Sequence, residues 1–192
     1  MKMLKMAALT FAASVGIVGS VNAQDVGLKA WSASAHIENA QSTAPAGATL
    51  VQLYRYYNAK EVNHFSGREM PQGWSDLGWR QDGTNGFISF TPFSGSRTLY
   101  SCFIPGGIDR FTSSDPNCEG QGRDSMNSIL GYVAESQIPG TVPLYRCQRG
   151  GIKKINGVWR SDHFDTLSSV CENVPRVHPR FHGHLREGRS RP

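Results

Sequence analysis

Apolar and aromatic residues recur along the chain in short runs, and one such run is written three times. It begins at Leu53 (LYRYY), at Leu99 (LYSCF) and at Leu144 (LYRC). Each copy is followed by an Asx-x-Phe triplet: Asn63-His64-Phe65, Asp109-Arg110-Phe111 and Asp162-His163-Phe164. The leucines lie 46 and 45 residues apart. A fixed period of this size is typical of a repeat protein whose copies form equivalent units.

Alternating apolar residues and turn residues predict short strands in each unit. In the first unit we expect strands at 50–57, 62–65, 76–80 and 86–91, with a tight turn at Asp82-Gly83. The second unit has strands at 99–104, 108–112 and 131–134, and a weakly marked one within 120–129. The third unit has an insertion at 150–159, read as an extended hairpin with Trp159 at its base, and a poor copy of the last strand at 181–185.

Three units of about 45 residues with roughly four short strands each predict an all-β, β-trefoil-like fold. In that fold the first and fourth strands of each unit close a barrel and the middle two form a cap. A small β-propeller is the alternative, because a four-stranded blade has a similar length, but three blades are too few to close one.

The N-terminus reads as a cleaved secretory signal peptide at 1–23, with Lys2 and Lys5 before an apolar run and Val21-Asn22-Ala23 at the cut. A retained signal anchor is the alternative. We expect a linker or N-terminal extension at 24–46 and a β domain at 47–185, with units 49–98, 99–141 and 142–185. A basic, disordered tail is expected at 186–192. The chain is therefore expected to be secreted or periplasmic and not to span a membrane.

The formal net charge of +5 belongs to the ends of the chain. Two signal-peptide lysines and five arginines after residue 175 supply it, so residues 24–175 are about neutral. A nucleic-acid-binding domain would carry its positive charge on the fold, so no nucleic-acid partner is expected.

The four cysteines fall on equivalent positions of the second and third units. Cys102 and Cys147 lie three residues after the repeat leucine, and Cys118 and Cys171 lie nine residues after the repeat aspartate. The repeat therefore predicts disulfides Cys102–Cys118 and Cys147–Cys171. In the first unit, Tyr56 and Gln72 replace the cysteines. A metal site is disfavoured because no Cys-x-x-Cys motif occurs, and no cofactor is expected.

The repeated polar residues are the first candidates for a ligand site. His64 and His163 could hydrogen-bond sugar hydroxyls, with Tyr54 or Tyr145 as a stacking platform. The alternative is architectural, with the aspartate capping a turn and the histidine bonding a neighbouring carbonyl. Arg55 and Arg146 could contact an anionic ligand, or could pair with acids such as Asp162 or Glu172.

The tryptophans and the C-terminal histidines are further candidates. Trp159 lies on the insertion, and Trp74 and Trp79 are divided between ligand contact and core packing. His178, His182 and His184 invite a metal hypothesis, but their spacing favours adventitious binding. No catalytic residue is assigned, because no nucleophile elbow, zinc-binding helix motif or phosphate loop occurs.

The chain resembles a family of secreted repeats of undetermined function, found in bacterial and fungal extracellular proteins and often appended to secreted hydrolases. The resemblance covers about residues 51–172 and is carried by the motifs at 53–58, 63–65, 99–100, 109–111, 131–133, 139–146 and 162–164. It implies a non-catalytic extracellular module for carbohydrate or cell-wall contact. The chain departs from the family pattern at Arg110, at Ser101 and in the stretched third unit.

Three functional hypotheses follow. The first is a secreted, non-catalytic module that binds carbohydrate or a cell-envelope glycan. The second is an extracellular protein-interaction or inhibitor module that uses the 150–159 loop. The third is an unrecognised hydrolase.

Overall fold

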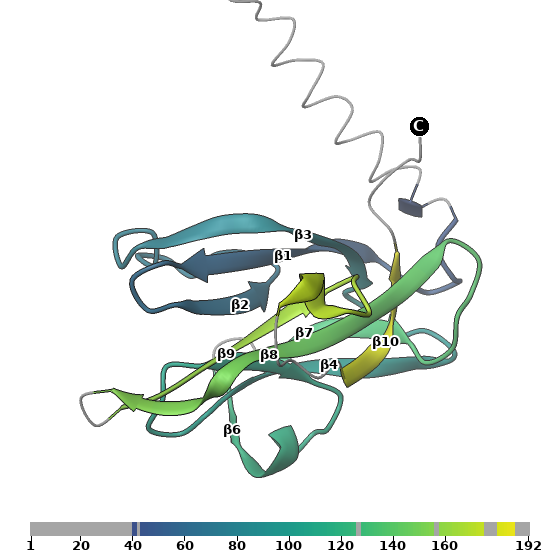
Figure 1. The fold of residues 1–192 in the computed structure, drawn as a ribbon. Helices are drawn as coiled ribbons and strands as arrows, with labels where there is room; N and C mark the ends of the chain where they lie inside the picture. Colours follow the sequence, from purple (N-terminus) through teal and green to yellow (C-terminus); the bar gives the residue numbers. More distant parts are fainter. Residues whose placement is uncertain (1–39, 42, 126–127, 156–157, 175–179, 187–192) are drawn as a thin grey trace, which may run out of the picture.

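A computed structural model describes residues 40–41, 43–125, 128–155, 158–174 and 180–186 (Figure 1). The signal peptide, most of the 24–46 segment, His178 and the 187–192 tail lie outside these residues. The predicted all-β class is confirmed, because the described elements are strands and two short 3-10 turns.

The strands of each unit follow the predicted order. The first unit holds β1 (Leu50–Asn58), β2 (Asn63–Gly67) and β3 (Trp79–Ser89). The second holds β4 (Ser96–Phe103), β5 (Arg110–Ser113), β6 (Gly122–Arg123) and β7 (Ile129–Ala134). The third holds β8 (Thr141–Ile155), β9 (Val158–Thr166) and β10 (Arg180–Arg186). The 3-10 turns are Cys118–Gly120 and Cys171–Asn173.

The same pairing occurs in all three units. The first strand (β1, β4 or β8) lies antiparallel between the second strand (β2, β5 or β9) and the last strand (β3, β7 or β10). The last strands meet one another through the single residue pairs Ser89–Tyr132, Phe87–Arg186 and Ala134–His184. The described strands therefore form one antiparallel sheet, in which these contacts join the three last strands to one another.

Two details of the strand prediction were wrong. Asp82-Gly83 does not end a strand, because β3 runs through it and pairs with β1 across two bulges. Trp159 lies near the outer end of the extended hairpin rather than at its base, since it pairs with Lys154. The last strand expected at 181–185 is present as β10, and its pairing with β8 compensates for its weak sequence pattern.

The three repeat leucines meet in one apolar core. Leu53, Leu99 and Leu144 have no exposed surface, and they pack with the buried side chains Ile88, Leu130, Val133 and Leu185. Ile88, Val133 and Leu185 come from the three last strands. Each such side chain contributes about 1.5–3 kcal/mol on burial, so this cluster is the main source of stability on the inner strands.

A glycine faces each repeat leucine: Leu53 pairs with Gly86, Leu99 with Gly131 and Leu144 with Gly183. All three glycines have positive φ. A Cβ on Gly131 would stand 2.5 Å from the carbonyl oxygen of Ser89, which no real side chain tolerates. These glycines allow the inner strands to approach closely.

Both predicted disulfides are present, Cys102–Cys118 and Cys147–Cys171. They enclose 16- and 24-residue separations, for which the chain-entropy account gives about 3 kcal/mol each. Each disulfide packs on the repeat phenylalanine of its unit, Phe111 or Phe164.

Aromatic rings replace the disulfide in the first unit. Tyr56, in the cysteine position, stacks on Phe65 with ring centroids 4.7 Å apart. Trp74 and Trp79 meet Phe65 edge-on at 4.9 and 5.0 Å. Trp79 is therefore a core residue, whereas Trp74 is only partly buried at the edge of this cluster.

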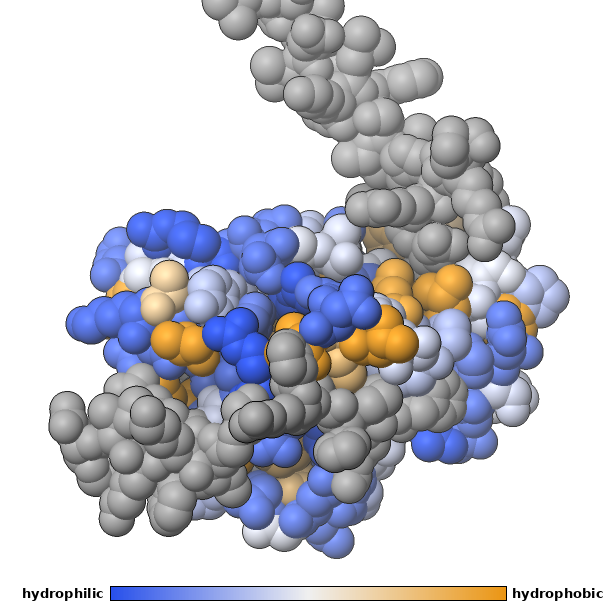
Figure 2. Space-filling model, viewed as in Figure 1, coloured by the Kyte–Doolittle hydropathy of each residue, from blue (hydrophilic) through white to orange (hydrophobic). Residues whose placement is uncertain are grey.

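The face drawn in Figure 2 is mostly hydrophilic, and its hydrophobic residues gather in small spots across the middle. Within the described residues, no helix combines the length and the apolar character needed to cross a membrane.

Candidate functional site

The Asx-His-Phe corners of the three units come together. Asn63, Asp109 and Asp162 are all buried. The Asn63 amide donates to the carbonyl of Ser161 at 2.7 Å and lies 3.4 Å from Asp109 Oδ1. Since these residues are more than 40 positions apart, this polar centre is a junction between units.

Two of the three junctions contain the same aspartate–histidine contact. At the junction of the third and first units, Asp162 Oδ1 accepts the backbone N–H of His64 at 2.8 Å and lies 2.8 Å from its ring Nδ1. At the junction of the second and third units, Asp109 accepts the backbone N–H of His163 at 3.1 Å, and its Oδ2 lies 2.5 Å from the ring Nδ1. Each aspartate therefore orients the histidine of the next unit around the ring.

The repeat arginines reinforce the same two junctions. Arg55 binds Glu172 at 2.5 Å and Asp82 at 2.7 Å, and Arg146 binds Glu119 at 3.0 Å. The expected Arg55–Glu172 pair is thus confirmed. Burial raises the pKa of Glu172, but the hydrogen bonds from Arg55 and Thr166 and the Arg55 charge outweigh it, so the pKa is lowered overall.

The repeat phenylalanine at each of these junctions is covered by two side chains of the next unit. The Arg146 guanidinium lies 4.8 Å from the centre of the Phe111 ring, and the His163 ring lies 5.3 Å from it. At the other junction, Arg55 and His64 lie 5.9 and 5.5 Å from Phe164. Phenylalanine, arginine and histidine thus form one structural set.

The junction of the first and second units lacks this set. Arg110 stands in the histidine position and Ser101 in the arginine position, while Asn63 replaces the aspartate. Asn63 Oδ1 is buried without a hydrogen-bond partner. Arg110 instead pairs with Asp124 and lies over the Trp74 ring at 4.9 Å. Arg110 and Ser101, the two residues that depart from the family pattern, therefore both belong to the junction of the first and second units.

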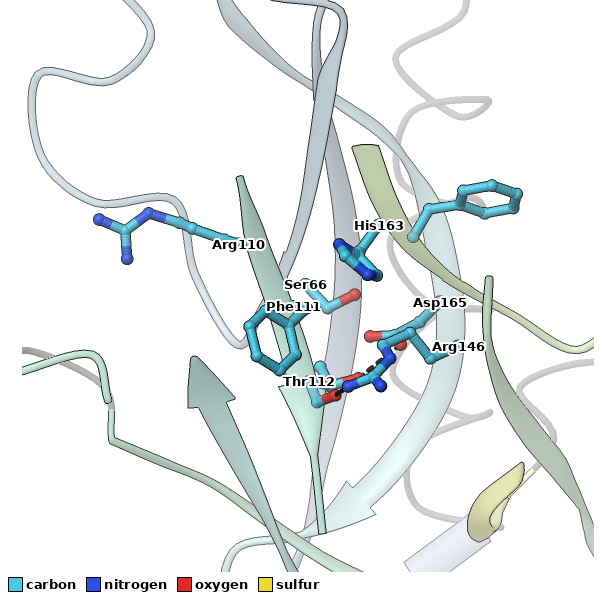
Figure 3. Close-up of a pocket in the computed structure, with 8 residues that line it drawn as sticks. Ser66, Arg110, Phe111, Thr112, Arg146, His163 and Asp165 are labelled. Carbon is cyan, nitrogen blue, oxygen red and sulfur yellow. Dashed lines mark hydrogen bonds between the residues drawn. The ribbon is translucent and has the colours of Figure 1, made fainter. Parts of the chain in front are cut away.

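A polar hollow opens where the second and third units meet (Figure 3). Its volume is about 10 Å³, room for about one water molecule, and it is partly open to solvent. Phe111, His163, Arg146 and Asp165 face a common space, whereas Arg110 extends away from it (Figure 3). The lining residues are Ser66, Arg110, Phe111, Thr112, Arg146, His163, Phe164 and Asp165.

One residue from each unit stands at the base of this hollow. Ser66, Thr112 and Asp165 each follow the repeat phenylalanine directly. The Thr112 hydroxyl donates to Asp165 Oδ1 at 2.6 Å, and Ser66 hydrogen-bonds the same carboxyl group. Arg146 donates to the Thr112 carbonyl at 2.6 Å, as the dashed line in Figure 3 marks. The base of the hollow is therefore held rigidly by all three units.

Asp165 is the most perturbed acid of the hollow. Its burial raises its pKa, and the hydrogen bonds of Ser66 and Thr112 with the charges of Arg146 and His163 offset this only in part. Titratable groups with such shifts in a concave site mark functional positions more often than ordinary surface groups do. The hollow thus combines an aromatic ring, a fixed guanidinium and a carboxyl group, which suits a ligand with an apolar face and hydroxyl groups.

The predicted site residues do not form one site. Arg146 and His163 line the hollow, whereas Arg55 and His64 hold the equivalent positions at the other junction. Tyr54 packs in the first-unit aromatic cluster, and the ring that covers His64 belongs to Tyr57, at 4.4 Å. Tyr145 lies half-buried in β8 opposite Thr166. The Trp159 side chain lies outside the described part of the structure.

Sequence reasoning missed Ser66, Thr112, Asp165 and Phe111. The repeat could have identified the positions of Ser66, Thr112 and Asp165, because each directly follows the repeat phenylalanine of its unit. The equivalence was missed because the three residues are of different types.

Across the described ranges, no cluster of three or more His, Cys, Asp or Glu side chains is arranged to hold a metal ion. His182 and His184 both lie in β10, with His182 fully buried. Burial lowers the pKa of His184.

Comparison of the chain with protein-family models, with curated proteins and with solved structures found no match.

Proposed function

We propose that this chain is an exported, non-catalytic module that binds carbohydrate at the polar hollow. The observation that carries the proposal is the convergence of Phe111, Arg146 and Asp165 on one small, partly open hollow. An aromatic ring beside oriented polar groups is the combination that recognises a sugar, whose C–H face is apolar and whose edge carries hydroxyl groups. Two disulfides support export, since such bonds persist in oxidising compartments.

The small volume limits the ligand. An interior of about 10 Å³ admits one small group of a sugar rather than a sugar ring. Arg146 is anchored by Glu119 and by the Thr112 carbonyl, so its remaining donors stand at a fixed position. Such preorganisation reduces the entropic cost of binding. The hollow therefore fits the end of a glycan chain or a protruding hydroxymethyl or amino group.

The aspartate–histidine contact beside the hollow does not require a catalytic role. Asp109 and His163 repeat the geometry of Asp162 and His64, which do not line this hollow. A contact that recurs at a second junction is explained by the joining of units. We therefore assign His163 a binding and positioning role.

The test is a glycan array on residues 24–192, followed by titration calorimetry with the glycan that binds. Arg146→Gln and Asp165→Asn are expected to weaken binding about tenfold or more, as loss of a buried polar contact does. Arg97→Gln is the matched control, because Arg97 makes an ion pair with Glu135 and does not line the hollow. It is expected to bind within about twofold of the wild type, since no contact at the hollow changes.

Equal loss of affinity in Arg146→Gln and Arg97→Gln would show that the loss does not come from the hollow and would contradict the proposal. Absence of any glycan signal from the folded wild type would contradict it as well. Near-ultraviolet circular dichroism of each variant establishes that the fold is retained.

A further inference from the structure

The polar hollow between the second and third units has room for one small group of a ligand. Its volume of about 10 Å³ is the space of about one water molecule. Asp165 at its base is 2% exposed, and Arg146 beside it is 6% exposed. A hydroxyl group fixed directly to a sugar ring would reach these side chains only if the ring itself entered, and the hollow is too small for a ring. The group that reaches them must therefore stand on an arm.

The base of the hollow can satisfy both hydrogen-bonding roles of a hydroxyl group. Arg146 donates to the Thr112 carbonyl at 2.6 Å and to Glu119 at 3.0 Å, and a guanidinium has further N–H donors. The carboxyl group of Asp165 bonds the side chains of Thr112 and Ser66, and its two oxygens have further lone pairs. Arg146 and Asp165 both face the space of the hollow (Figure 3). A ligand hydroxyl can thus accept from Arg146 and donate to Asp165.

The surroundings of the base favour a neutral group over a charged one. Phe111 lines the hollow with an apolar ring, which suits a methylene group. A carboxylate has two oxygens where the hollow has room for about one, and it would lie against the carboxyl group of Asp165. An ammonium group would lie against the guanidinium of Arg146, which has the same charge. Of the small groups that a sugar carries on an arm, hydroxymethyl therefore fits best.

We propose that the hollow selects hexopyranoses through their hydroxymethyl arm. The inference rests on the carbohydrate-binding function proposed above and names the sugar class of that same site. The methylene group of the arm contacts Phe111, and its hydroxyl takes the place of about one water molecule between Arg146 and Asp165. A pentopyranose lacks the arm, so water stays at the base and these hydrogen bonds to the sugar are lost.

The experiment compares pairs of methyl glycosides that differ only in this arm: glucoside with xyloside, galactoside with L-arabinopyranoside, and mannoside with lyxoside. NMR titration of the backbone amides of residues 24–192 measures each affinity. At least one hexoside is expected to bind about tenfold or more tightly than its pentoside, because only the hexoside bonds the polar base directly. Methyl galacturonide, with a carboxylate in place of hydroxymethyl, is expected to bind as weakly as the arabinopyranoside. The amides of Thr112 and Asp165 are expected to shift, which locates the sugar without any substitution.

Arg146→Gln is expected to reduce the preference for the hexoside to less than about threefold, whereas Arg97→Gln, which does not alter the hollow, should keep it. A hexoside and its pentoside that bind within about twofold of each other would overturn this inference and leave the carbohydrate-binding function standing. A preference that is unchanged in Arg146→Gln would overturn it as well. If no methyl glycoside binds although a glycan of the array does, only this inference is wrong. Absence of binding in both assays would contradict the proposed function too.

Discussion

His64 and Asp162 lie 98 residues apart in the chain, and both the backbone N–H and the ring Nδ1 of His64 lie 2.8 Å from the same carboxylate oxygen. This contact joins the first unit to the third and so closes the ring of units end to end. The same arrangement joins the third unit to the second through His163 and Asp109. The chain therefore depends on polar contacts between units as well as on its apolar core.

Removal of the Asp162 carboxylate is expected to destabilise the fold strongly. Asp162→Ala leaves the buried N–H of His64 without an acceptor and should lower the free energy of unfolding by about 3 kcal/mol. Asp162→Asn keeps one oxygen as acceptor, so about 1 kcal/mol is expected. Urea unfolding measures both, with Asp76→Ala at an exposed site as the control. An Asp162→Ala protein as stable as the control would show that the contact does not hold the units together.

Relief of backbone strain at Val62 is expected to stabilise the protein. Val62 has φ +52°, which is strained for a β-branched residue, and its side chain is 46% exposed. Val62→Gly should therefore raise the free energy of unfolding by about 1 kcal/mol. Val170→Gly is the matched control, since Val170 is also exposed but has φ −107°. Thermal denaturation compares them, and a melting temperature that falls in Val62→Gly would contradict the assignment of strain.

The first-unit aromatic cluster is expected to matter as much as a disulfide. Trp79 is buried against Phe65 and Trp74, so Trp79→Ala should cost about 3–5 kcal/mol. Leu77→Ala, at a side chain that is 64% exposed, should change stability by less than about 0.5 kcal/mol. Guanidinium unfolding with both disulfides intact measures the difference. A small effect at Trp79 would mean that the first unit is held by its neighbours instead.

Asp165 should make stability depend on pH in a direction opposite to that of an ordinary ion-paired acid. Its pKa is raised in the folded protein, so the folded state keeps a proton that the unfolded chain releases above about pH 4. Stability from this group is therefore present at low pH and is lost as pH rises through the raised pKa. Asp165→Asn should flatten that decline in urea unfolding measured from pH 3 to 8.

Glu172 provides the comparison of opposite sign. Its pKa is lowered from 4.5, so its contribution is present above that pH and is lost as pH falls through the lowered value. Glu172→Gln should therefore reduce stability at neutral pH and leave it nearly unchanged under strong acid. If the stability of wild type and of Asp165→Asn changed with pH in parallel, the assignment of Asp165 as a buried carboxyl group with a raised pKa would be contradicted.

The sequence predicts the core and the disulfides well because both depend on spacing within a unit. Leu53, Leu99 and Leu144 keep one position in each copy, and so do the cysteine pairs. The strand pairing within each unit then brings the leucines into the core and the cysteines of each pair together. The bulged strand β3 was missed because Asp82-Gly83 has the same residues as a hairpin turn, and only the full length of β1 as a partner distinguishes the two.

The candidate site was predicted only in part, because it forms between units. His163 and Arg146 were recognised from their repetition, but spacing alone does not say that Asp109 rather than Asp162 binds His163. Asp165 escaped notice because its counterparts are Ser66 and Thr112, so no residue type repeats. Its burial and perturbed pKa arise from the packing of three units and have no signature in any one of them.

The most direct test of the account is a crystal structure of residues 24–192 soaked with the glycan that the array identifies. The account predicts that a protruding group of the sugar enters the hollow beside Phe111, within hydrogen-bond distance of Arg146 or Asp165. A ligand seated only on Trp74 and the first-unit aromatic cluster, with the polar hollow empty at saturating concentration, would contradict it.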